Sequence, residues 1–393
     1  MYYHLNQRTW YIKLRISGHI GPFTELNMEE CLLCNKIIKD LDKHYRTANG
    51  VVCNECAEEI FSMANGLTLV DPVEDMMIES SCPKPKELYN KLNEYVIGQD
   101  DAKKTLSIAV YNHYKRLRSD KIDKSNILMI GPSGSGKTLL CKTLAKFLSV
   151  PFVICDATTL TQAGYIGEDV ESMLTKLYIE SGYDIKSTER GIIFIDEIDK
   201  ISEVKTGGRD ASGLGVQQAL LKFLEGSKVN VPTKLGKQQN CETIVIDTDN
   251  ILFICSGAFV NLKEHSIDGL IDFGLIPEMI GRLPIIVETK ELSQEDIKRI
   301  ITEPKNNILD QYKELFKLDG IELVFNEDAL ELIYKVCYES KLGARGIRTV
   351  FEAVLKDSMF NSPGKKKKVI ISKTTVNNSL KLYNENFYIN NDK

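Results

Sequence analysis

The chain has 393 residues, 43% hydrophobic and 27% charged, so it is long enough for several buried cores and is not a small disulfide-stapled scaffold. Its 26 glycines and 11 prolines are too few for a fibrous or disordered chain. With 50 basic and 55 acidic residues, the net charge of −5 gives no overall attraction to nucleic acid or to an anionic membrane.

Residues 1–27 are predicted to be an N-terminal extension. It has neither the apolar core nor the small-residue cleavage site of a signal peptide, which favours a cytoplasmic protein with reduced thiols. It is also poor in acidic residues, which leaves an organellar presequence open, although hydrophobic and polar residues alternate over 10–17 as in a strand. No apolar run in the chain approaches the length that a membrane-spanning helix needs.

Residues 28–66 are predicted to form a zinc-binding domain. Two C-x₂-C pairs separated by eighteen residues are typical of a structural zinc site with four thiolate ligands, and these are Cys31, Cys34, Cys53 and Cys56. So short a segment cannot hold a core alone, so we expect zinc to supply its folding energy. Disulfides are the alternative, which a reducing compartment disfavours. The other six cysteines have no metal spacing and are expected to be buried thiols: Cys82, Cys141, Cys155, Cys241, Cys255 and Cys337.

A polar linker containing proline is predicted over residues 67–86, followed by an α/β domain over 87–291. In the domain, short apolar runs alternate with amphipathic stretches, which is typical of a parallel sheet wrapped by helices. The predicted strands are residues 126–130, 152–155, 191–195 and 251–255. A smaller, mainly helical domain is predicted over 292–374, opened by a helix with Ser293 as N-cap and closed by a strand at 369–372. Residues 375–393 are predicted to be a tail.

The run Gly131–Thr138 matches the phosphate-binding pattern G-x-x-x-x-G-K-[ST] between a predicted strand and a predicted helix. In this motif backbone N–H groups surround a phosphate, Lys137 reaches the β- and γ-phosphates, and the Thr138 hydroxyl binds Mg²⁺. A glycine turn without a ligand is the alternative, which the flanking strand and helix argue against. The candidate nucleotide-binding residues here are Pro132, Ser133, Gly134, Ser135, Gly136, Lys137, Thr138 and Leu139.

Two carboxylates, Asp196 and Glu197, end the apolar run 191–195, where a parallel sheet presents its ligand-binding edge. We expect Asp196 to orient Mg²⁺ and Glu197 to polarise the water that attacks the γ-phosphate. The two motifs together predict an ATPase or a GTPase.

Further motifs, in the same order along the chain, resemble the ClpX family of AAA+ unfoldases over about residues 28–372. The motifs are Tyr95–Gln99, Gly131–Thr138, Gly164–Gly167, Asp196–Glu197, Val216–Lys222, Phe273–Pro284 and Gly343–Gly346. The resemblance implies an AAA+ P-loop fold and an ATP-driven hexameric ring with ATP, Mg²⁺ and Zn²⁺ as cofactors. Such a ring pulls protein substrates through its pore.

The resemblance also implies roles for individual side chains. By it, Val96 and Ile97 line the adenine pocket, Arg282 is an arginine finger that reaches the neighbouring subunit's nucleotide, and Arg345 acts on nucleotide in its own subunit. An arginine fork suits phosphate oxygens and offsets charge that grows during phosphoryl transfer. Taken alone, either arginine is more often a surface ion pair.

The resemblance assigns Tyr165 and Ile166 to a loop that grips polypeptide in the pore, whereas the tyrosine alone would be interpreted as a turn residue. It implies that the zinc domain dimerises and recruits substrates or adaptors, and that a Clp peptidase is a partner. The chain departs from the family at residues 260–272, which replace a long insertion that docks on the peptidase. Whether a peptidase binds therefore stays open.

Two other functional classes are considered beside an unfoldase with or without a peptidase. A nucleic-acid-remodelling AAA+ ATPase finds support in the basic run Lys365–Lys368, although such a run is usually solvated and the residues after Cys56 are acidic. An adaptor with inactive nucleotide sites conflicts with the intact Lys137, Asp196 and Glu197.

Overall fold

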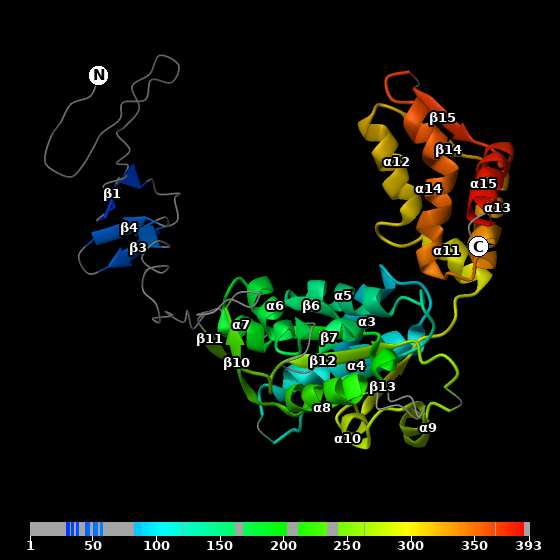
Figure 1. Cartoon of the computed structure of the whole chain (residues 1–393). Coiled ribbons are helices and arrows are strands. Elements are labelled where there is room, and N and C mark those ends of the chain that lie inside the picture. Colours follow the sequence, from blue (N-terminus) through cyan, green and yellow to red (C-terminus); the bar gives the residue numbers. More distant parts are fainter. Residues whose placement is uncertain are drawn as a thin grey trace, which may run out of the picture. The chain divides into compact units, whose positions relative to one another are not determined.

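The computed structural model describes residues 29–31, 33–34, 37–38, 44–47, 50–53, 56–57, 82–119, 121–161, 168–202, 211–233, 243–262, 264–365 and 367–388. The chain divides into two compact units, Met1–Ser81 and Cys82–Lys393 (Figure 1). The predicted N-terminal extension and most of the predicted linker lie outside the described residues.

The described residues of the first unit include two short antiparallel strand pairs. They are β1 (Glu29–Glu30) with β2 (Ile37–Ile38), and β3 (His44–Thr47) with β4 (Gly50–Cys53). Among the described residues of this unit, a buried cluster consists of Cys31, Val51, Val52, Cys53 and Ala57. Two of these five are cysteines, and both belong to the predicted zinc ligands.

The second unit is built on a five-stranded sheet in the order β13-β5-β12-β9-β6, with every pairing parallel. Its strands are β5 (Ile127–Ile130), β6 (Phe152–Asp156), β9 (Ile192–Asp196), β12 (Leu252–Gly257) and β13 (Ile285–Glu288). The three inner strands are buried almost throughout, as apolar runs are when helices cover both faces. The four predicted strands and the α/β class are therefore confirmed, and β13 is a fifth strand that was not predicted.

Alternate residues of β5 enter different cores on the two faces of the sheet. Ile127 and Met129 pack with α3 (Pro85–Asn93), α4 (Asp100–Arg116) and α5 (Lys137–Leu148). The opposite face packs against helices that include α6 (Ser172–Glu180), α8 (Ala211–Glu225), α9 (Ile267–Phe273) and α10 (Pro277–Gly281). Shorter elements complete this part: η1 (Ala157–Thr159), β7 (Leu160–Thr161), β8 (Glu168–Asp169), α7 (Ile185–Glu189), η2 (Ile198–Ile201), β10 (Lys228–Pro232) and β11 (Thr243–Asp247).

The C-terminal part of this unit is mainly helical and has its own core. Its elements are α11 (Gln294–Thr302), α12 (Ile308–Leu318), β14 (Glu322–Phe325), α13 (Glu327–Glu339), α14 (Ala344–Asn361), β15 (Lys368–Ile371) and α15 (Lys373–Tyr388). The predicted cap is present, because Ser293 Oγ accepts from the Asp296 N–H at 3.1 Å and Asp296 Oδ2 accepts from the Ser293 N–H at 3.0 Å. The predicted last strand corresponds to β15, which pairs with β14 in parallel.

Part of the predicted tail is helical in the structure. Within α15, Val376 is completely buried and Leu380 is 9% exposed, and both belong to the C-terminal core. Residues four apart lie on one face of a helix, so these two side chains form an apolar face that packs on the domain. Because asparagines stand between these two apolar residues, the sequence does not show a clear helical pattern here. Within the described part of the chain, no helix is both long enough and apolar enough to cross a membrane.

Candidate functional site

The phosphate loop, residues 131–136, leads from the buried strand β5 directly into α5. At its start Gly131 has φ +150°, and a Cβ there would lie 2.1 Å from Thr289 Oγ1, so only glycine fits this approach. At its end Gly136 is the N-cap of α5 with φ +100°. The loop therefore delivers its backbone to the N-terminus of a twelve-residue helix, where N–H groups and the helix dipole favour a phosphate.

Lys137 lies beneath the phosphate loop and is 8% exposed. Its Nζ donates to the carbonyl oxygens of Gly131 at 2.6 Å and Pro132 at 3.0 Å. Burial lowers the pKa of Lys137, and the nearby carboxylates of Asp196 and Asp199 partly oppose that effect. The lysine amino group is thus held against the backbone of the phosphate loop.

Thr138 and Asp196 meet beside the loop, where the hydroxyl of Thr138 donates to Asp196 Oδ2 at 3.4 Å. Hydroxyl and carboxylate oxygens are the ligands that Mg²⁺ prefers, so this pair fits the predicted magnesium site. Glu197 follows β9 with φ +58°, and its side chain is exposed. An exposed carboxylate one residue beyond the metal-binding position is free to orient a water molecule.

Asp199 is a buried carboxylate near these residues that the sequence patterns did not single out. It is 4% exposed, it accepts from the Ala258 N–H at 3.2 Å, and it forms a 3.1 Å ion pair with Lys200. It therefore ties η2, which follows Glu197, to the end of β12. Its place three residues after Asp196 is a signal that could have identified it.

The first turn of α14 lies directly on the phosphate loop. The Ala344 N–H donates to Gly134 O at 3.1 Å, and Arg345 Nη1 contacts Ser133 Oγ at 3.4 Å. A cavity of about 280 Å³ opens beside this contact. It is lined by Pro132, Ser133, Gly134, Ser135, Glu291, Leu292, Ile297, Cys337, Tyr338, Glu339, Lys341 and Gly343. The structure thus brings Arg345 to the phosphate loop.

The predicted adenine residues, Val96 and Ile97, are both buried but do not line this cavity. The segment that carries them is joined to the site by Gln99, whose Nε2 donates to Ser135 O at 3.4 Å and to Lys290 O at 2.7 Å. Gln99 Oε1 also accepts from the Lys290 N–H at 2.8 Å.

Thr289, one residue before Lys290, is a second contact that sequence patterns missed. Its hydroxyl is 2.7 Å from that of Ser135, and its backbone N–H donates to Ile130 O at 2.8 Å. Through Thr289 and Lys290, the segment between β13 and α11 is bound to the phosphate loop. No local pattern marks these residues, because their partners are distant in the sequence.

Arg282 lies outside this site in a single copy of the chain. It is the C-cap of α10, its side chain is 52% exposed, and Glu225 of α8 accepts from its Nε at 3.2 Å and its Nη2 at 2.9 Å. Its guanidinium is therefore at the surface of the second unit, paired with a carboxylate of the same chain. The predicted pore residues, Tyr165 and Ile166, lie outside the described residues.

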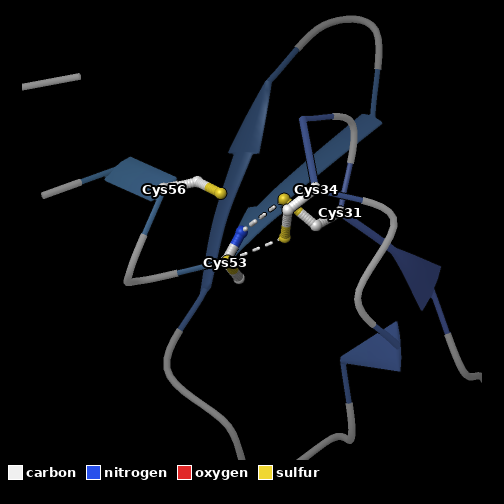
Figure 2. Close-up of side chains that lie close together, drawn as sticks. All are labelled: Cys31, Cys34, Cys53 and Cys56. Atoms are coloured by element: carbon white, nitrogen blue, oxygen red, sulfur yellow. Dashed lines mark hydrogen bonds between the residues drawn. The ribbon is translucent and has the colours of Figure 1, made fainter. Parts of the chain in front are cut away.

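The four predicted zinc ligands come together in the first unit. All four sulfur atoms lie within 4.8 Å of one another, and Cys34 Sγ is 3.7 Å from Cys53 Sγ (Figure 2). Four thiolates at a Zn–S distance of about 2.3 Å place sulfurs about 3.8 Å apart at the corners of a tetrahedron, so the cluster fits zinc. The Cys53 N–H donates to Cys31 Sγ at 3.3 Å, and this bond contributes most to lowering the pKa of Cys31 to about 6, whereas hydrogen bonds with Cys34 and Cys53 raise the pKa of Cys56. A lowered thiol pKa favours the thiolate that a metal needs.

Two family models match the second unit. The first, described as an AAA domain (Cdc48 subfamily), matches residues 122–286. The second, described as the C-terminal, D2-small domain of ClpB protein, matches residues 292–376.

Curated relatives are similar over nearly the whole chain. One from Treponema denticola is 44% identical, over 89% of this chain and 94% of its own length. One from Porphyromonas gingivalis is 44% identical, over 88% of this chain and 94% of its own. One from Borrelia duttonii is 42% identical, over 90% of this chain and 92% of its own. All three are named ATP-dependent Clp protease ATP-binding subunit ClpX.

Proposed function

The chain belongs to the ClpX family of AAA+ ATPases and hydrolyses ATP, and from this premise we propose that it is a protein unfoldase that pulls polypeptides through the pore of a ring. The observation that carries the proposal is the contact between Ala344 N and Gly134 O at 3.1 Å. Since the phosphate loop touches the C-terminal helical part, a change of nucleotide on the loop alters a contact that orients this part. Coupling of that kind converts hydrolysis into motion.

Each residue of the site has a part in hydrolysis under this proposal. Lys137 and the N-terminus of α5 bind the β- and γ-phosphates, while Thr138 and Asp196 hold Mg²⁺. When bound, the metal ion offsets charge on the phosphate oxygens. Glu197 orients the attacking water and accepts its proton as the oxygen attacks the γ-phosphorus and the bond to ADP breaks. Arg345, whose Nη1 lies 3.4 Å from Ser133 Oγ, acts on the nucleotide of its own subunit.

Arg282 completes the site of a neighbouring copy in the proposed hexamer. An arginine finger of this kind is worth about 10³–10⁵ in rate where it acts. The finger is exposed here and its partners in the same chain are on α8, which suits a role in trans. Tyr165 and Ile166 are proposed to press on polypeptide in the pore, because an aromatic side chain between glycines can contact an extended chain of almost any sequence.

The zinc cluster of the first unit is proposed to be a module that dimerises and recruits protein substrates or adaptors. The four clustered cysteines would hold zinc, whose binding would add to the folding energy of so short a module. We place the protein in the cytoplasm, where the six remaining cysteines stay reduced.

We further propose that the chain is the ATP-binding subunit of a Clp protease, as its relatives are named. A free-standing remodeller without a peptidase is the second candidate, and one observation favours it. Between β12 and Phe273 the chain has the short helix α9 and few other residues, which leaves little length for a protruding docking arm.

The decisive experiment follows the fluorescence and the integrity of a tagged fluorescent protein with ATP, with and without the organism's Clp peptidase. ATP-dependent loss of fluorescence is expected for the wild type and not for Glu197→Gln, which keeps nucleotide binding but loses hydrolysis by about 10²–10⁴-fold. Degradation with peptidase assigns the protease role, and unfolding without degradation assigns the free-standing role. Unchanged fluorescence beside active ATP hydrolysis would contradict both, and ATPase stimulated by DNA in a salt-sensitive manner would favour a nucleic-acid remodeller.

A further inference from the structure

Asn126 joins the ends of two helices at the surface where Arg282 emerges. The side chain is 1% exposed, and its Nδ2 donates to Leu224 O at 3.0 Å and to Arg282 O at 3.0 Å. Leu224 lies in the last turn of α8, and Arg282 caps α10. One buried amide therefore fixes the backbone of Arg282 relative to that of α8.

Glu225, next to Leu224, fixes the side chain of the same arginine. One carboxylate oxygen, Glu225 Oε1, accepts from both Nε and Nη2 of Arg282, and among the described residues Nη1 has no recorded partner. Glu225 thus orients the guanidinium through Nε and Nη2, while Nη1 can donate to another acceptor. Because the pair is about half exposed, it is weak enough for a phosphate to compete with it.

The choice of asparagine at position 126 is not explained by stability alone. Its Oδ1 is buried and has no hydrogen-bond partner within the described part of the chain. A buried polar atom without a partner is unfavourable. What the asparagine contributes is the two hydrogen bonds from its Nδ2 that link α8 to Arg282.

The same asparagine connects this corner to the phosphate loop of its own chain. Asn126 directly precedes β5, and Gly131 directly follows it. The strand is paired on both sides, with β12 and β13, and spans about 13 Å at the rise of a parallel strand. Arg282 and the phosphate loop are therefore anchored at opposite ends of one rigid, buried strand.

We propose that Asn126 and Glu225 are positioning residues that hold Arg282 in the orientation in which it reaches the nucleotide of a neighbouring copy. Asn126 sets the place of the arginine backbone, and Glu225 sets the direction of the guanidinium. This inference rests on the proposed function, in which Arg282 acts in trans. Asn126 lies at the opposite end of β5 from the phosphate loop, and Glu225 is bound to Arg282, so a defect in either should be repaired by an intact neighbour.

The test measures ATP hydrolysis in rings mixed from two variants. Glu225→Gln keeps the shape of the side chain and removes its charge, and we expect it to lower kcat about tenfold while ADP affinity stays unchanged. Added Glu197→Gln subunits cannot hydrolyse ATP but carry an intact Arg282. They should therefore raise the ATPase rate per Glu225→Gln chain towards the rate per wild-type chain in a mixture of wild type with Glu197→Gln. Asn126→Ala, if it folds, should behave alike.

Arg282→Ala is the benchmark, and Glu331→Gln is the matched control, since Glu331 forms a surface ion pair of 2.9 Å with Lys298 away from the site. The control should hydrolyse ATP like wild type. Rescue of both Arg282→Ala and Glu225→Gln supports the inference. Rescue of Arg282→Ala without rescue of Glu225→Gln overturns the inference and leaves the proposed function intact. If Arg282→Ala itself is not rescued, the arginine does not act in trans and both fall.

Discussion

Gly343 and Gly134 pack backbone to backbone, so closely that a Cβ on Gly343 would lie 2.9 Å from Gly134 O. The reverse substitution is tighter still, since a Cβ on Gly134 would lie 2.6 Å from Leu342 O. Both are below the separation that real side chains reach. The phosphate loop and the turn before α14 can therefore approach only because both positions lack a side chain, and this approach is what allows Ala344 N to reach Gly134 O.

Gly343→Ala should therefore weaken nucleotide binding as well as stability. A side chain at φ +58° and ψ −147° is strained by about 1–3 kcal/mol, and the clash with Gly134 adds to that. Gly320→Ala is the matched control, because its φ of +71° is similar but no atom lies within 4 Å of the new Cβ. We expect about a tenfold loss of affinity for a fluorescent ADP analogue in Gly343→Ala only. Equal affinities in the two variants would contradict the packing argument.

Gln99 should matter for the nucleotide site through its bonds to the backbone of Lys290. Gln99→Ala removes two hydrogen bonds to that backbone and one to Ser135, each worth about 1 kcal/mol net. We expect a loss of roughly 1–3 kcal/mol in the free energy of unfolding, measured in urea, together with weaker ADP binding.

Lys290→Ala provides the control for Gln99. It removes only the exposed ion pair with Asp101, whose side chains are 77% and 83% exposed, and keeps the backbone bonds to Gln99. Its stability and ADP affinity should match those of wild type. If Lys290→Ala lost as much stability and ADP affinity as Gln99→Ala, the side chain of Lys290 and not its backbone would be the partner that counts.

Local patterns account for the central strands of the sheet and for the position of the phosphate loop. Buried strands such as β5 appear as continuous apolar runs because both of their faces are covered, and the phosphate loop has a fixed spacing since its glycines must turn the backbone. The strand β13 is as long as β5, but it lies at the edge of the sheet, is only partly buried, and ends in the charged Glu288, so its apolar run is only three residues. The cysteine spacing is equally local, and it predicted a cluster that the structure contains.

Contacts between distant segments could not be predicted in this way. Thr289 and Ser135 are 154 residues apart, and Gln99 and Lys290 are 191 apart, so no window of sequence contains both partners. The pair of Glu225 with Arg282 also joins helices that are not consecutive. These are the contacts that hold the functional groups in place, and they exist only once the sheet has brought its strands together.

Lys124 should make stability depend on pH in the alkaline range. Its Nζ donates to Phe223 O at 2.9 Å and Thr248 O at 2.7 Å, and burial lowers its pKa to about 7. The unfolded lysine has a pKa of about 10.4, so between about pH 7 and pH 10 the unfolded chain binds more protons than the folded one. Stability should therefore rise with pH in this window, by at most about 1.4 kcal/mol per unit from this group.

The check compares urea unfolding at several pH values between about 7 and 9 in wild type and Lys124→Met. The methionine variant should have the smaller slope of stability against pH, because it has no proton to release. Lys121→Met, which changes an exposed lysine nearby, should keep the slope of wild type. Identical slopes in all three proteins would show that Lys124 does not titrate in this range.

Zinc removal should unfold the first unit and leave ATP hydrolysis by the second intact. Cys31→Ser takes away a buried ligand of the four-sulfur cluster, and an apparent binding free energy of about 10–16 kcal/mol is at stake for a structural zinc site. Metal analysis should find about one zinc ion per chain in wild type and a large loss in the variant. Since Lys137, Asp196 and Glu197 belong to the second unit, basal ATPase should persist.

Cys82→Ser is the control, because Cys82 lies outside the cluster and its thiol donates only to Pro83 O, so this variant should retain zinc. Full zinc content in Cys31→Ser would mean that the cluster is not the site that holds the metal.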